Sequence, residues 1–232
     1  MIAGKLLPIL PGLQAHASGA LWLPESGTAV IADLHLGYSW AQRRRGELGP
    51  LVDTQTRTKL FQCKDELRPK RFVFLGDLVH APRSCAPERE WIEETLRQLG
   101  ESAELIAVRG NHDREFAAEF AQLDLVHVEA WSDRVLVAIH GDRFECACPE
   151  DHTLVLGHLH PALSIRDASG AGQKLPVFLA NSHCIMLPAF SPFAVGHNVA
   201  CGLPPEMRKC FGKESIHVYA ASGKRVVRLG LL

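Results

Sequence analysis

The chain has 232 residues, of which 47% are hydrophobic and 22% charged, a balance that is typical of a globular protein, excludes wholesale disorder and fits one domain over residues 1–232. Lysine and arginine number 25 against 26 acidic residues, so the net charge of −1 excludes a globally basic nucleic-acid binder but not a local basic patch. No apolar run approaches the roughly 18–20 residues of a membrane span, so no membrane association is expected.

Short apolar strands alternate with amphipathic helices along the chain. After an N-terminal segment of strands up to Leu23, near-continuous apolar runs predict strands buried on both faces at residues 28–32, 71–75, 104–108, 134–139 and 153–156. Apolar periodicity predicts helices at residues 53–67, with Asp53 as the N-cap, 87–99 and 114–123. This alternation predicts an α/β sheet with crossover helices. Beyond His160 the pattern becomes β-rich, with strands expected at 176–180, 184–187, 215–220 and 225–229.

Side chains that bind metals follow five of the predicted strands. The set comprises Asp33 and His35, Asp77, Asn111 and His112, His140, and His158 and His160. Sites in α/β proteins form at the carboxyl ends of strands, and residues two apart in an extended segment point to the same side. Asp33 and His35 are therefore expected to hold one ion together, and His158 and His160 to face one cleft. Each motif alone could be a turn or a helix cap, but five in succession predict a metal centre.

The order of these motifs, Asp-x-His, Gly-Asp, Gly-Asn-His-Asp, His and Gly-His-x-His, resembles the signature of the calcineurin-like metallophosphoesterases. That resemblance implies an α/β sandwich of two mixed β-sheets flanked by helices. The stretches IADLHLGY, RRRGELGP, FLGDLVH, VRGNHD, GHLHP and LPAF are more closely similar to the DNA ligase-associated (PdeM-type, ICC-like) phosphoesterases. Two features depart from the latter pattern: Tyr38 stands where many bacterial members carry Lys, and residues 191–199 (SPFAVGHNV) replace an expected Gly-Gly-x-Asp-Val.

The resemblance also implies a ligand set for two ions. One ion would be held by Asp33, His35 and His160, the other by Asn111, His140 and His158, and Asp77 would bridge them. Carboxylate, amide and imidazole ligands suit divalent transition ions, with Mn favoured and Fe or Zn as alternatives. His112 lies outside this set, so we expect it to protonate the leaving group or bind the developing charge, with Asp113 orienting its ring. The alternative for His112 is a turn histidine that caps the next helix.

Two further features are candidate substrate-binding residues. Arg43, Arg44 and Arg45 follow the first motif and either contact a phosphate backbone or form a solvated face. Few aromatic residues interleave with these arginines, so the sequence does not indicate base stacking on this patch. His80 either lines the mouth of the site or is a plain loop histidine.

The cysteines bear on location. Seven cysteines, an odd number, and the lack of a secretory signal predict a cytoplasmic protein with reduced thiols. Cys146 and Cys148 are expected to be free thiols, and a structural metal clip is the alternative.

Together these observations predict a two-metal phosphodiesterase. The expected activity is that of a metal-dependent endonuclease that acts on single-stranded DNA in DNA repair, and the resemblance adds a DNA ligase and a helicase as partners. A hydrolase of a small phosphodiester or nucleotide is the alternative within the same fold. In a different class, the alternative is a non-catalytic calcineurin-like scaffold, but such scaffolds lose the histidines that this chain keeps.

Overall fold

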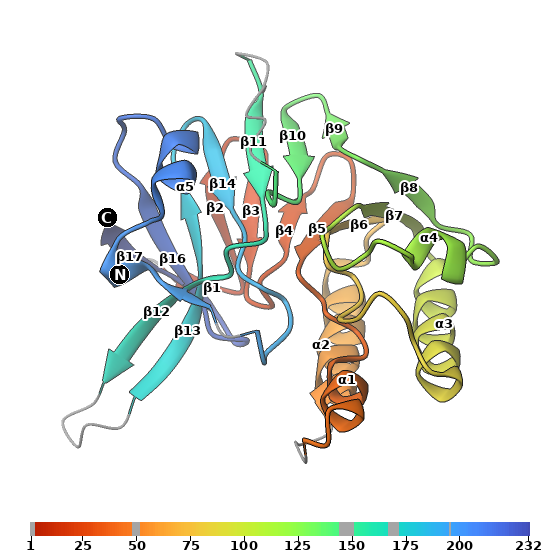
Figure 1. Ribbon diagram of the computed structural model, residues 1–232. Helices are drawn as coiled ribbons and strands as arrows, with labels where there is room; N and C mark the ends of the chain where they lie inside the picture. The colour runs from red at the N-terminus through yellow and green to blue at the C-terminus, as the bar shows by residue number, and fades with distance from the viewer. Residues whose placement is uncertain (1–2, 48–51, 144–150, 167–171, 195) are drawn as a thin grey trace.

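The computed structural model describes residues 3–47, 52–143, 151–166, 172–194 and 196–232. The strands form two mixed β-sheets that pack face to face, and helices cover their outer faces (Figure 1). This arrangement confirms the expected α/β sandwich. Within the described ranges, no helix is long and apolar enough to cross a membrane. Cys146 and Cys148, the residues of the hypothetical metal clip, lie outside the described residues.

The first sheet contains three of the strands that precede the metal-binding motifs. Its seven strands lie in the order β2 (Leu6–Leu10), β3 (Leu13–His16), β4 (Leu21–Leu23), β5 (Thr28–Ala32), β6 (Arg71–Leu75), β7 (Glu104–Val108) and β8 (Val126–Val128). The strands from β5 to β8 run parallel. Leu75 pairs with Ala32 on one side and with Val108 on the other, so the carboxyl ends of β5, β6 and β7 lie side by side.

The second sheet contains the other two strands that precede metal-binding motifs. Eight of its ten strands lie in the order β1 (Ala3–Gly4), β17 (Val226–Leu231), β16 (His217–Ala221), β13 (Gly172–Ala180), β14 (Cys184–Met186), β11 (Thr153–Leu156), β10 (Leu136–Ile139) and β9 (Trp131–Asp133). Of the remaining two, β12 (Pro161–Arg166) pairs with β13, and β15 (His197–Asn198) pairs with β12. The parallel pairing of Ile139 with Leu156 aligns the ends of β10 and β11.

The strand–helix alternation predicts an α/β sheet with crossover helices, but it does not predict that the five motif-bearing strands divide between two sheets. A tight turn, not a crossover helix, joins β9 to β10, with Asp133 paired to Leu136 in an antiparallel register. The chain therefore leaves the first sheet after β8 and begins the second one. The resemblance to the two-sheet family anticipates this division, whereas the periodicity of the sequence does not.

Helices connect the strands at the edges and on the outer faces. The structure has α1 (Tyr38–Arg44), α2 (Val52–Leu67), α3 (Ala86–Gly100), α4 (Phe116–Glu119), α5 (Pro205–Cys210) and the 3-10 helix η1 (Val199–Cys201). Two of the three predicted helices, α2 and α3, are confirmed to within a residue. The third is reduced to α4 because Phe120 leaves the helical conformation (φ −115°, ψ 30°) and packs against Phe116 (centroids 4.7 Å apart). The sequence pattern does not predict α1 or α5.

Three apolar clusters hold these layers together. Val30 of β5 packs with Phe178 of β13 between the two sheets. Ile31, the next residue of β5, belongs instead to the cluster under α2 and α3. Met207 of α5 lies in a third cluster, on the outer face of the second sheet. Successive side chains of a strand point to opposite faces, so β5 is buried on both and has a continuous apolar sequence.

The starts of α1 and α2 cap each other. Asp53, expected to cap the helix at 53–67, lies inside the first turn of α2. Its carboxylate accepts hydrogen bonds from the backbone N–H groups of Gly37 (3.0 Å) and Ser39 (2.9 Å), at the start of α1. In return, Ser39 Oγ accepts one from the N–H of Val52 (2.9 Å). The first N–H groups of a helix have no partner within it, so this exchange stabilises both helices and fixes the position of Tyr38.

Replacing Asp53 with alanine should therefore destabilise the protein. The change removes a buried charged acceptor from two N–H groups, for which we expect a loss of about 2–3 kcal/mol in the free energy of unfolding. Asp65→Ala, at an exposed position of the same helix, should change it by less than about 0.5 kcal/mol. Urea unfolding followed by circular dichroism measures both values. Equal stability of the two variants would contradict the capping role.

Candidate metal centre

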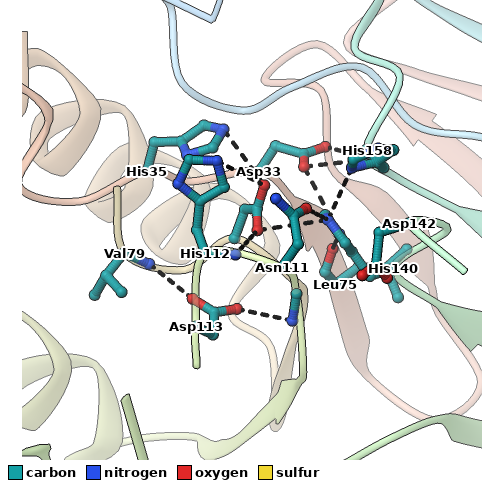
Figure 2. Close-up of polar contacts among 12 residues, drawn as sticks. Asp33, His35, Leu75, Val79, Asn111, His112, Asp113, His140, Asp142 and His158 are labelled. Atoms are coloured by element: carbon teal, nitrogen blue, oxygen red, sulfur yellow. Dashed lines mark hydrogen bonds and ion pairs between the residues drawn. The ribbon is translucent and has the colours of Figure 1, made fainter. Parts of the chain in front are cut away.

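Strand ends from both sheets converge on one point. Asp33 and Asn111 follow β5 and β7 of the first sheet, whereas His140 and His158 follow β10 and β11 of the second. Figure 2 shows these side chains pointing toward one another. The sandwich therefore brings together motifs that lie on separate sheets.

The backbone at these strand ends adopts a conformation that is rare for residues other than glycine. Six described non-glycine residues have a positive φ, and five of them are expected ligands: Asp33 (56°), His35 (48°), Asp77 (48°), His158 (66°) and His160 (53°). Such a conformation costs of order 1–3 kcal/mol per residue and persists where the surrounding structure imposes it, often at functional sites. Backbone geometry thus singles out the same residues as the sequence motifs.

The first group of candidate ligands comprises Asp33, His35 and His160, whose ligand atoms lie within 4.8 Å of one another. Asp33 is fully buried, and its Oδ1 lies 3.2 Å from Nε2 of His160. Burial lowers the pKa of His35 to about 4, so the ring is neutral and able to ligate at pH 7. His35 Nδ1 is buried and has no hydrogen-bond partner among the described residues. Buried polar atoms are rarely left in this state unless a ligand serves them.

The second group comprises Asp77, His140 and His158, again within 4.8 Å. Nε2 of His140 lies 3.1 Å from both Asn111 Oδ1 and His158 Nδ1. On the other side of the ring, Nδ1 of His140 donates a hydrogen bond to the Leu75 carbonyl (3.1 Å). A carbonyl only accepts, so Nδ1 carries a proton, and loss of the Nε2 proton would leave the Nε2 lone pair directed at the other ligand atoms.

Asp77 lies between the two groups. Its Oδ2 is 3.9 Å from His35 Nε2, and its Oδ1 is 3.5 Å from His140 Nε2. Burial opposes ionisation of this carboxyl, but the contact with His140 and a hydrogen bond from the His112 backbone N–H (2.9 Å) lower its pKa below the usual range. One charged carboxylate therefore reaches both groups of ligand atoms.

The residues present fit two divalent ions. Carboxylates, imidazoles and an amide oxygen, without a thiolate, suit ions of the first transition series. Burial disfavours the charged form of His140, but contacts with Asp77 and the charge of Asp33 raise its pKa to about 9. A proton and a metal ion compete for such a nitrogen. The site therefore has an excess of negative and ligating groups that ions would satisfy.

A sequence model of the family described as calcineurin-like phosphoesterase matches residues 28–181. The chain belongs to this family. The match contains every candidate ligand described above and establishes the protein as a metal-dependent phosphoesterase, a hydrolase. No curated protein sequence matches the chain.

Solved structures extend the comparison to the fold. The nuclease MPE of Pseudomonas putida has a TM-score of 0.70 and 24% identity to this phosphoesterase, over 94% of each chain. The E. coli phosphoesterase Yfce has a TM-score of 0.44 and 15% identity, over 88% of this chain and 99% of its own. The likeness to MPE shows a common fold over nearly the full length of both chains.

Two further histidines of the phosphoesterase lie beside the ligands. His112 Nδ1 donates to the backbone carbonyl of His80 (2.6 Å), and its Nε2 lies 4.0 Å from Asp77 Oδ2. The His80 ring stacks on that of His112 (centroids 5.5 Å apart) and meets His35 edge-on (5.4 Å). Because the His80 carbonyl accepts a hydrogen bond from Nδ1–H of His112, Nε2 of His112 is directed at the metal centre. His112 thus has a nitrogen placed for proton transfer, and His80 lies at the rim.

Contrary to expectation, Asp113 does not orient the His112 ring. Its Oδ1 accepts from the Val79 N–H (3.1 Å) and its Oδ2 from the Gly110 N–H (3.0 Å), as Figure 2 shows. Burial raises the pKa of this carboxyl to about 6. Asp113 therefore ties the loop after β7 to the loop after β6. The His80 carbonyl, which no side-chain motif marks, is what holds the ring of His112.

The arginine run lies at the end of α1, near the rim of the site. Arg44 forms an ion pair with the buried carboxylate of Glu88 on α3, which gives it a structural partner. The expected phosphate contact therefore depends on Arg43 and Arg45 more than on Arg44, and it stays a prediction.

His80 lies close to this arginine run. Burial, His112 and the charge of Arg45 lower the pKa of His80 to about 4. The substrate-binding role of His80 also stays a prediction.

A hollow of about 500 Å³ opens beside His160. Its cationic residues are Lys59 and Lys174, and its described lining contains no Asp or Glu. Lys59 Nζ donates to the Phe190 carbonyl (2.7 Å) and lies over the Phe190 ring (4.2 Å from the centroid). No motif in the sequence marks this hollow, because its walls come from distant segments.

A second hollow, of about 570 Å³, opens beside Asn111 and His140. Its charged lining consists of Arg109, Arg114 and Arg143 with Glu129 and Asp142. The candidate metal centre therefore lies between two hollows in which cationic side chains outnumber acidic ones.

Replacing Gly110 with alanine should remove the ions and the activity. A Cβ at this position would overlap the backbone nitrogen of Asp77 and lie 2.5 Å from its Oδ1. A displacement of about 1 Å at a catalytic group costs about 100-fold in rate, and we expect at least that loss in hydrolysis of a nitrophenyl diester. In the control Gly100→Ala, a Cβ would meet nothing closer than Leu105 Cδ1, at 3.7 Å. Full metal content of Gly110→Ala in elemental analysis would contradict this account.

Binding of Mn²⁺ to the ion-free protein should release protons. The pKa of His140 is raised to about 9, so its ring carries two protons at pH 7 and must lose one to bind an ion through Nε2. His35, whose pKa is lowered to about 4, has none to release. Affinity should therefore rise with pH between 6.5 and 8, by about tenfold per unit for one proton. Calorimetry in buffers of different ionisation enthalpy counts the protons, and zero release at pH 7 would refute the prediction.

Proposed function

We propose that this phosphoesterase is a two-metal phosphodiesterase that cuts single-stranded DNA internally, in DNA repair, in the cytoplasm and with Mn²⁺ as its metal. The observation that carries the proposal is the position of the metal centre between two hollows with an excess of cationic side chains. The excess is Lys59 and Lys174 in one hollow and Arg114 in the other, where Glu129 and Asp142 pair with the remaining arginines. A strand that crosses the centre has phosphates on both sides of the scissile bond, and a cationic surface on each side suits it. A small phosphate ester would need a cationic surface on only one side.

The comparisons support the same substrate class. The similar structure from Pseudomonas putida is that of a nuclease. The resemblance of the motifs to the DNA ligase-associated phosphoesterases supports a place in DNA repair beside a ligase and a helicase. Both lines of support come from other proteins and are therefore independent of the two hollows, which are observed in the structure of this chain.

The chemistry divides between the ions and the chain. When bound, two divalent ions would lower the pKa of a water, so that hydroxide is available at neutral pH, and would offset phosphate charge. The residues that would hold them are Asp33, His35 and His160 on one side, Asn111, His140 and His158 on the other, and Asp77 between. His112 presents Nε2 to the centre while Nδ1–H is held by a carbonyl, so its doubly protonated form can give a proton to the departing oxygen.

The function is tested with purified protein and two forms of single-stranded DNA, linear and circular. We expect Mn²⁺-dependent cutting of both, because an endonuclease needs no end, and much weaker activity with Mg²⁺ after chelation. A small nitrophenyl diester serves as the control for an intact metal centre. Hydrolysis of the diester without any cutting of DNA would favour the small-substrate alternative, and cutting of the linear form alone would contradict internal cleavage.

His112→Ala separates proton transfer from metal binding. The backbone N–H that donates to Asp77 is kept in alanine, so both ions should remain. We expect the rate on DNA to fall by about 10²–10⁴, the usual contribution of a general acid. The loss should be much smaller on a nitrophenyl diester, whose leaving group needs no proton. His127→Ala, an exposed histidine on β8, is the control. An equal loss on both substrates would exclude the leaving-group role.

A further inference from the structure

Two aromatic residues that are far apart in the sequence meet next to the metal centre. Tyr38 is the first residue of α1, and Phe193 lies in the loop between β14 and β15. Their rings are nearly parallel, with an interplanar angle of 25° and centroids 6.5 Å apart. The Tyr38 ring also contacts His80 (4.7 Å), which stacks on His112 (5.5 Å). A continuous row of four rings therefore runs from Phe193 to His112.

This pair of rings is anchored to the backbone that carries the ligands. The N–H of Ser191, two residues before Phe193, donates to the carbonyl of Asp33 (3.1 Å). The N–H of Tyr38 donates to the carbonyl of His35 (3.3 Å). The rings are therefore held in place relative to the first group of ligands, and a molecule that binds on them need not order the protein.

Neither ring belongs to the core. Tyr38 and Phe193 are half-buried, whereas Phe190, in the same loop as Phe193, is fully buried. Half-buried rings offer aromatic surface to a ligand, and every nucleobase can stack on a π-face whatever its identity. The position of these rings beside a phosphodiesterase centre matches a single strand, whose bases are free to stack, and not a paired duplex.

The hollow that Phe193 lines suits the backbone of the same strand. It contains His160 and Lys59 and has no acidic residue in its described lining. Among the residues that the structure describes, Lys59 Nζ contacts the carbonyl and ring of Phe190 and no carboxylate. Burial lowers the pKa of Lys59 to about 8, which leaves it mainly protonated at pH 7. A cation next to an aromatic face is the combination that single-stranded nucleic acids bind.

We propose that Tyr38 and Phe193 form a stacking platform for the base of a nucleotide next to the scissile phosphate. The inference rests on the proposed nuclease function and adds a base-binding position to it. The platform lies apart from the arginine run, on which the sequence does not indicate base stacking. The platform discriminates a nucleotide with a base from one without, and it accepts any base.

The test uses short single strands with one phosphodiester among phosphorothioate linkages. The nucleotide on either side of that phosphodiester carries a base or is abasic, and KM and kcat are measured with Mn²⁺. In the wild type, removal of one flanking base should raise KM about 5- to 100-fold. The double variant Tyr38→Leu with Phe193→Leu keeps apolar volume without a π-face. Its KM on the intact strand should rise about as much as base removal raises that of the wild type, and its preference for the intact strand over the abasic one should disappear. Tyr38→Phe with Phe193→Tyr should keep it.

The control is Phe61→Leu, a half-buried ring on α2 that contacts Arg57 and Lys64, which should behave as the wild type. Equal KM for intact and abasic strands in the wild type would overturn the platform and leave the nuclease function standing, and this comparison needs no variant. An unchanged preference in the double leucine variant would overturn it as well. A wild type that cuts none of the strands but hydrolyses a nitrophenyl diester would overturn the proposed function and the platform together.

Discussion

The close approach of the two sheets at one edge is the constraint on which the rest of the structure depends. Gly76 and Gly157 lie at this junction. A Cβ at Gly76 would overlap Nδ1 of His140, and a Cβ at Gly157 would lie 2.9 Å from Cβ of Ala32 on the other sheet. Only glycine allows the strand ends to come this close. The Gly-Asp and Gly-His-x-His motifs therefore owe their glycines to packing and their Asp and His to chemistry.

Holding ligands at this junction is costly in two ways. Five expected ligands have a strained backbone with positive φ, and two carboxylates, Asp33 and Asp77, are buried close to the same histidines. Hydrogen bonds from backbone N–H groups and the charge of His140 offset part of the electrostatic cost. Two divalent ions would offset the remainder, so metal binding and folding stability are thermodynamically linked in this protein.

The metal centre and its surroundings determine different aspects of function, the reaction and the substrate respectively. The ligand set accounts for hydrolysis of a phosphate ester, whereas the surfaces beside it select the substrate. Tyr38 and Phe193 lie in the two segments in which the sequence departs from the pattern of the DNA ligase-associated phosphoesterases, and in the structure their rings contact each other. The two departures are thus one local feature, next to the hollow that opens at His160.

The sequence by itself determined the strands that precede the motifs, two of the helices and the candidate ligands, whereas β8, β9, β12 and β15 were not predicted. Strands such as β5 are buried on both faces and so show continuous apolar runs, and motif residues directly follow them. The tertiary structure alone decided the partners: Asp53 caps α1 and not its own helix, the His80 carbonyl and not Asp113 holds His112, and Phe193 meets Tyr38. These contacts join segments that no local pattern relates, because a hydrogen bond or ring contact depends on where two distant backbones meet and not on the periodicity of either.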